Sequence, residues 1–145
     1  MTLNLKSIPT QAGGWFKPKE TLDAVAILVE VSAWDRQRPT PNGPKDSALC
    51  NVSVFRTPEQ LSSLTPEVSQ GMRIEQTVLA RDLETMIGSA VLVTVAQIPP
   101  TKPGANPAWV WRQVNDPTIR AQVIAYAEQR DKAVEAAVTA APTFD

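Results

Sequence analysis

The sequence predicts a mainly β protein, a five-stranded barrel with a short helix between the third and fourth strands. Five segments are rich in β-branched residues, or alternate between apolar and polar residues with the period of a strand. A short segment with helical spacing lies between the third and fourth of them, and a longer helical pattern follows the fifth. We therefore divide the chain into an N-terminal arm (1–21), a β-barrel (22–114) and a C-terminal helix with a short tail (115–145).

The N-terminal arm is polar and is interrupted by proline and glycine, which is typical of a segment that leads into a domain. It contains one aromatic pair, Trp15 and Phe16. Large aromatic side chains are buried more often than not, so we expect this pair to anchor the arm on the barrel.

The first two strands, 22–34 and 48–55, form a predicted hairpin whose loop is centred on Asn42 and Gly43, a strong turn signal. Strict alternation in each strand separates a core face from an opposite face, and it predicts Cys50 to be a small buried residue. The expected core faces hold Val25, Ile27, Val29, Val31 and Ala33 in the first strand, and Ala48, Cys50, Val52 and Val54 in the second. Trp34 and Phe55 fall on the opposite faces.

The remaining strands are 72–78, 90–98 and 108–114. Residues 79–87 have helical spacing, and Gly88 stands where a left-handed helix end is expected. The last two strands are joined by a proline-rich loop. The C-terminal helix begins at Asp116-Pro117, a favourable start, and runs to position 138. Its apolar positions must pack on the barrel or on a second subunit, and they are Ile119, Val123, Tyr126, Val134 and Val138.

The composition suits one globular domain: 145 residues, 43% hydrophobic and 20% charged, with a net charge of −1. Residues 1–114 contain 11 Lys and Arg residues and 10 Asp and Glu residues. Residues 115–145 contain 3 Lys and Arg residues and 5 Asp and Glu residues. A polyanionic partner would therefore need a local basic patch. The chain has no apolar run long enough to cross a bilayer and no pattern of a secretion signal. With a single cysteine, it is expected in a reducing cytoplasm.

Catalytic chemistry is hard to find in this sequence. It contains no histidine, no set of ligands with zinc or calcium spacing, and no glycine-rich phosphate-binding motif. The carboxylates Glu75, Asp82 and Glu84 are expected to be solvated surface groups. We predict a protein that is not an enzyme and that needs no cofactor, metal or small-molecule substrate.

The order of the five strands and the short helix is that of an OB-like barrel, a fold that often holds single-stranded nucleic acid. Such proteins combine cations with aromatic side chains on which bases stack. Trp109 and Trp111 share one strand face, and the sequence leaves open whether that face fills the core or meets the ligand. The candidate nucleic-acid-binding residues are Trp34, Arg36, Arg38, Lys45, Phe55, Arg73, Lys102, Trp109, Trp111 and Arg112.

Several strings in the chain together resemble a group of small actinobacterial phage and prophage proteins. They include Gly-Trp-Phe-Lys-Pro at 14–18, Ala-Ile-Leu-Val-Glu at 26–30, Val-Leu-Ala-Arg-Asp-Leu at 78–83 and Asn-Pro-Ala-Trp-Val-Trp at 106–111. The resemblance covers residues 13–130. It implies an OB-like fold, binding of single-stranded DNA in phage replication or recombination, and a location in the cytoplasm of the bacterial host.

A second hypothesis is a phage virion component, such as a capsid-decorating or head–tail joining protein built on a small β-barrel. The near-neutral charge and the N-terminal arm favour it, because arms often lock onto neighbouring subunits. The basic loops and outward aromatic residues favour DNA. The sequence leaves open the length of DNA bound, any base preference and whether the chain forms homo-oligomers.

Overall fold

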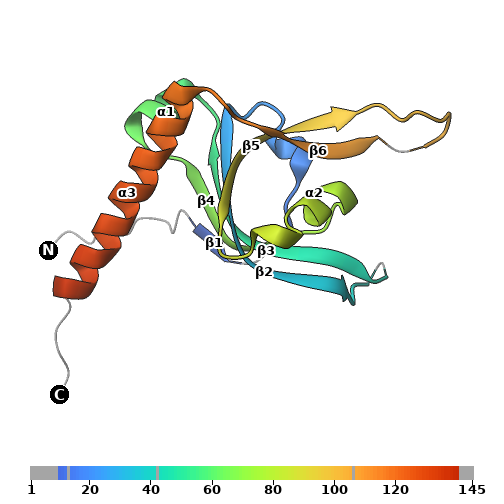
Figure 1. Cartoon of the computed structure of the whole chain (residues 1–145), viewed down its shortest axis with the longest axis horizontal. Coiled ribbons are helices and arrows are strands. Elements are labelled where there is room, and N and C mark those ends of the chain that lie inside the picture. The colour runs from blue at the N-terminus through green and yellow to red at the C-terminus, as the bar shows by residue number, and fades with distance from the viewer. Residues whose placement is uncertain (1–9, 13, 42, 106, 141–145) are drawn as a thin grey trace, which may run out of the picture.

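The computed structural model describes residues 10–12, 14–41, 43–105 and 107–140 and contains six strands and three α-helices within them (Figure 1). The strands are β1 (Thr10–Ala12), β2 (Ala26–Arg38), β3 (Lys45–Phe55), β4 (Glu67–Ile74), β5 (Ala90–Ile98) and β6 (Ala108–Gln113). The helices are α1 (Pro58–Ser63), α2 (Thr77–Asp82) and α3 (Pro117–Ala140), with 3-10 turns η1 (Pro18–Thr21) and η2 (Glu84–Met86). The mainly β prediction is confirmed.

The strands form one sheet in the order β1-β4-β3-β2-β5-β6. All neighbours are antiparallel except β1, which runs parallel to β4. The five predicted strands are therefore present, and α2 follows the third of them as expected. The third strand begins earlier than predicted, at Glu67, and ends at Ile74, so that α2 starts at Thr77.

The predicted closed barrel is not formed, because the edge of β4 that could close it is occupied. One side of β4 pairs with β3, and the other side pairs with the N-terminal segment, first through β1 and then at a bridge between Trp15 and Arg73. Within the described part of the chain, β6 pairs with β5 alone. The sheet consequently stays open, and the arm supplies a strand that the sequence pattern did not predict.

The inner face of the bent sheet packs against α2 and forms the first core. Phe16 from the arm is only 2% exposed and belongs to this core, so the predicted anchoring role of Phe16 is confirmed. Cys50 is also fully buried, as predicted, and desolvation raises the pKa of its thiol to about 12. The first core consists of Phe16, Ala24, Ile27, Val29, Val31, Ala48, Cys50, Val52, Val54, Ile74, Leu79, Leu83, Val93 and Val95.

A β-bulge in β2 reverses the predicted alternation. Val31 pairs with Cys50 and Ala33 pairs with Leu49, so that Ser32 is an extra residue in the strand. After this residue each side chain changes face. Trp34 therefore points to the first core, and Ala33 lies on the outer face, both opposite to the prediction.

The outer face of the sheet is covered by α3 and α1 and forms a second core (Figure 1). Phe55 is 0% exposed and meets the Tyr126 ring edge-on, with centroids 5.5 Å apart. Its companions are Ala26, Leu28, Leu61, Val123 and Tyr126. The prediction that the C-terminal helix packs on the sheet is thus confirmed for its first half. Val134, in the second half, remains 59% exposed.

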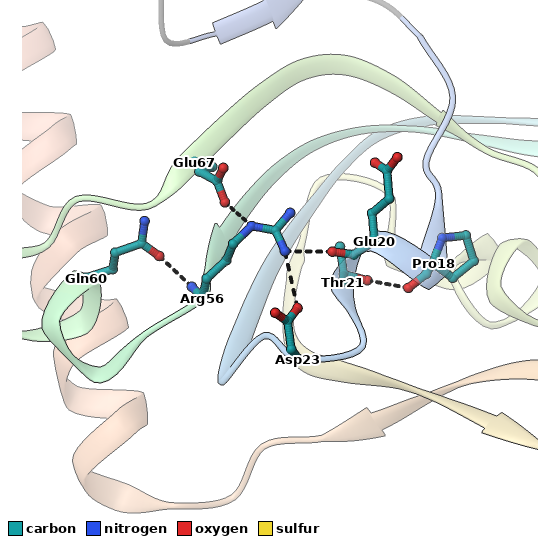
Figure 2. Close-up of polar contacts among 7 residues, drawn as sticks. All are labelled: Pro18, Glu20, Thr21, Asp23, Arg56, Gln60 and Glu67. Carbon is teal, nitrogen blue, oxygen red and sulfur yellow. Dashed lines mark hydrogen bonds and ion pairs between the residues drawn. The ribbon is translucent and has the colours of Figure 1, made fainter.

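Arg56 ties the N-terminal segment to the sheet (Figure 2). Its guanidinium donates through Nη1 to the Glu20 carbonyl at 2.6 Å and to Asp23 at 3.3 Å, and through Nε to Glu67. Its backbone N–H donates to Gln60 Oε1. Arg56 therefore joins the turn around η1 to β4 and α1, and its charge is matched by carboxylates.

The β2–β3 and β5–β6 hairpins project on the same side of the molecule, with α2 between them in this view (Figure 1). Gly43 in the first hairpin has φ +100°, a left-handed conformation that favours glycine. Its neighbour Asn42 lies outside the described residues. The predicted turn is formed, and both strands extend further toward it than expected.

Candidate nucleic-acid interface

The four aromatic residues among the candidates pack against the two cores. Phe55 is fully buried beneath α3, so the prediction that it contacts DNA is wrong. Trp34 and Trp111 are half-buried against α2 and donate their indole N–H groups to the carbonyls of Ala80 at 2.8 Å and Leu79 at 3.0 Å. Trp109 packs against the same core. Both tryptophans of β6 therefore lie on the core face.

Three of the four arginines in the predicted set form ion pairs with carboxylates. Arg36 pairs with Glu84 at 2.9 Å, Arg38 with Glu75 at 3.3 Å, and Arg73 with Asp35 at 2.7 Å. Phosphate binding by these groups would compete with existing ion pairs. Arg36 and Arg38 are thus engaged in ion pairs in the folded chain, whereas Lys45, the third member of the predicted hairpin patch, is not.

The other three predicted cations are exposed and form no ion pair with any described residue. Lys45 is the first residue of β3, Lys102 lies in the loop between β5 and β6, and Arg112 lies on β6. The two hairpins that carry them project on the same side (Figure 1). These three charges are available to a polyanion.

Trp15 was expected to be buried with Phe16, and this expectation is wrong. The arm runs alongside β4, where Arg73 accepts a hydrogen bond from Phe16 N–H at 2.8 Å and donates one to the Gly14 carbonyl at 2.9 Å. In an extended segment neighbouring side chains point to opposite sides. Phe16 consequently enters the core while Trp15 is 60% exposed. The sequence did contain a signal for this difference in burial, because two neighbouring residues of an extended arm point to opposite sides.

Trp15 lines a surface hollow of about 430 Å³ at the loop end of the β2–β3 hairpin. Its indole N–H donates to Glu75 Oε1 at 3.1 Å, and Arg38 donates to the other oxygen, Oε2, at 3.3 Å. The Glu75 side chain is only 10% exposed. We call this site the Trp15 hollow, and its lining residues are Trp15, Thr40, Pro41, Lys45, Glu75 and Gln76.

The Trp15 hollow combines an exposed aromatic ring, a carboxylate that orients the ring, and an ammonium group that forms no ion pair with a described residue. A ring held by a hydrogen bond loses little further freedom when a flat ligand stacks on it. Stacking platforms beside cations are the parts from which single-strand binding sites are made. The sequence predicted Lys45 as a binding residue but did not predict that Trp15, Glu75 and Gln76 would lie beside it.

Among the residues that the structure describes, no group of three or more His, Cys, Asp or Glu side chains is arranged to hold a metal ion. No helix in the described ranges is long and apolar enough to cross a membrane. No family model, no curated protein and no solved structure matches this chain.

Proposed function

We propose that this protein binds single-stranded DNA, without catalysis, through the Trp15 hollow and the neighbouring cations of the two hairpins. The observation that carries the proposal is the exposed Trp15 ring, fixed by Glu75 and placed beside Lys45. A base reaches such a ring only when it is free of a duplex stack, so a single strand is the matching ligand. Lys102 and Arg112 would contact the phosphates of the same strand farther along.

The strand order supports the same class of protein. From β4 to β6 the sheet has the order β4-β3-β2-β5-β6, with α2 between β4 and β5, which is the arrangement of an OB-like fold. We infer an opened relative of this fold, in which the N-terminal arm occupies the edge of β4 that would close a barrel. The resemblance to small actinobacterial phage proteins supports a role in phage DNA replication or recombination in the host cytoplasm.

The experiment is a fluorescence-anisotropy titration of a labelled single strand of about 20 nucleotides at low salt. Trp15→Ala removes the stacking surface, and we expect binding to weaken by about 1–3 kcal/mol. Trp15→Phe keeps an aromatic face and serves as the matched control, with affinity close to that of the unmodified protein. Duplex DNA of the same length should compete poorly. Equal affinity of the alanine and phenylalanine variants would contradict the proposal.

The ion pairs of Arg36, Arg38 and Arg73 favour a second candidate function, a phage virion protein that decorates the capsid or joins head and tail. A surface whose arginines are already paired with carboxylates of the same chain suits contacts with other proteins. In the described part of the chain, the outer edge of β6 has no strand beside it, and this edge could pair with a strand of a neighbouring subunit. If the protein is a virion component, purified virions should contain it in a fixed number of copies. If it is a DNA-binding protein of replication or recombination, purified virions should lack it.

A further inference from the structure

The hydrogen-bond donors of the Trp15 hollow are largely committed within the protein. The Trp15 indole N–H donates to Glu75, and the Gln76 amide nitrogen donates to the Phe16 carbonyl at 3.0 Å. Because this bond fixes the amide orientation, the Gln76 oxygen Oε1 is identified, and it is buried without a hydrogen-bond partner among the described residues. That oxygen has almost no exposed area and is therefore closed to a ligand, whereas the Lys45 ammonium remains as a donor in the hollow.

Acceptor capacity also remains on Glu75. Each carboxylate oxygen has two lone-pair sites, and Oε1 accepts a hydrogen bond from Trp15 while Oε2 accepts one from Arg38. The Glu75 carboxylate is only 10% exposed and has little access to water, so a ligand that supplies N–H groups gains more here than one that presents carbonyl oxygens. The hollow is thus complementary to a donor-rich flat ring.

We propose that the Trp15 hollow is a base-selective subsite that prefers a nucleobase with an exocyclic amino group over one with a carbonyl at the same position. This inference rests on the proposed binding of single-stranded DNA. Cytosine presents an amino group where thymine and uracil present an oxygen, and carboxylates are good acceptors for that amino group. A cytosine stacked on Trp15 would donate to Glu75, whereas a uracil there would place oxygen against oxygen.

The first test compares oligo-dC with oligo-dU of equal length, because these pyrimidines differ at C4 and N3 and not in a methyl group. The titration is made at about pH 8, where cytosine is unprotonated and a glutamate side chain is charged. We expect oligo-dC to bind about five- to tenfold more tightly than oligo-dU. Oligo-dT, with the same carbonyl group, should behave like oligo-dU.

The second test changes the acceptor itself. Glu75→Gln keeps an oxygen for the Trp15 indole and adds an N–H₂ donor, so the ratio of the two affinities should fall to within about twofold. The same change also frees Arg38 from its ion pair with Glu75. A free Arg38 raises the affinity for oligo-dC and oligo-dU alike, so this second effect does not itself alter the ratio of the two affinities. Glu59→Gln, a change of the same kind at an exposed position of α1, is the matched control and should keep the full preference for oligo-dC.

The outcomes separate the two proposals. Equal binding of oligo-dC and oligo-dU by the unmodified protein overturns base selection and leaves DNA binding standing. A preference that Glu75→Gln does not alter overturns its assignment to the Trp15 hollow. Failure of every strand to bind overturns both.

Discussion

Arg130 and Glu30, 100 residues apart in the chain, are joined by two parallel hydrogen bonds, from Nη1 to Oε1 at 2.5 Å and from Nη2 to Oε2 at 3.0 Å. The bonds to this carboxylate raise the pKa of Arg130 above its usual range. The guanidinium also lies over the Tyr126 ring, 5.7 Å from its centroid. The Arg130–Glu30 pair connects α3 to β2, one helical turn beyond the buried Tyr126.

We expect this ion pair to stabilise the docked helix modestly. Each side chain is about a third exposed, so the coupling energy between Arg130→Ala and Glu30→Ala in a double-mutant cycle should be about 1 kcal/mol. Urea denaturation of the four proteins measures it. A coupling energy near zero would mean that solvent screens the pair completely and that the apolar residues alone hold α3.

Phe55→Ala should destabilise the protein strongly because it leaves a cavity between the sheet and α3. The expected loss is about 3–5 kcal/mol in the free energy of unfolding, measured by urea denaturation. Trp15→Ala is the matched control, an aromatic residue removed from an exposed position, and its denaturation midpoint should be nearly unchanged. A Phe55→Ala variant with unaltered stability and impaired DNA binding would contradict the location of Phe55 in the second core.

Cys50 should be unreactive in the folded protein. With a pKa of about 12 in place of 9.0, the thiolate population near pH 8 is lower by roughly a thousandfold. Labelling by a thiol reagent should be slow in buffer and fast in urea. The raised pKa also means that the folded state holds this proton more tightly, so its stabilising contribution is complete below about pH 9 and declines as the pH rises toward 12. Rapid labelling of the folded protein would show that the first core opens readily.

Lys45, Lys102 and Arg112, the three predicted cations that form no ion pair with a described residue, should determine the salt dependence of DNA binding. Replacing all three by alanine should reduce the slope of log affinity against log salt by about 2, because each phosphate that a cation neutralises on a single strand contributes about 0.7 to this slope. Lys132→Ala on α3 is the control and should leave the slope unchanged. An equal slope in the folded triple variant would exclude the hairpins from phosphate binding.

The sequence was a good guide to where the strands lie because β-branched and alternating residues mark them, although both faces of β2 and β3 are buried over much of their length. It failed at Trp34 because one extra residue, Ser32, reverses the faces, and a bulge has no strong signal in a single sequence. Phe55 was assigned correctly to the outer face, but only the docked α3 reveals that this face is a second core. The open sheet was not predicted, because nothing local shows that the arm pairs with β4, a strand more than 50 positions away.

The most direct test of the central claim is the quenching of tryptophan fluorescence by single-stranded DNA. Trp34, Trp109 and Trp111 are half-buried against the first core, so a stacked base should quench Trp15 above all. Saturation with oligo-dC should quench part of the emission of the unmodified protein. In Trp15→Phe the same strand should bind with similar affinity by anisotropy while this quenching disappears. Undiminished quenching in Trp15→Phe, or none in the unmodified protein with DNA bound, would contradict the assignment of the binding site to Trp15.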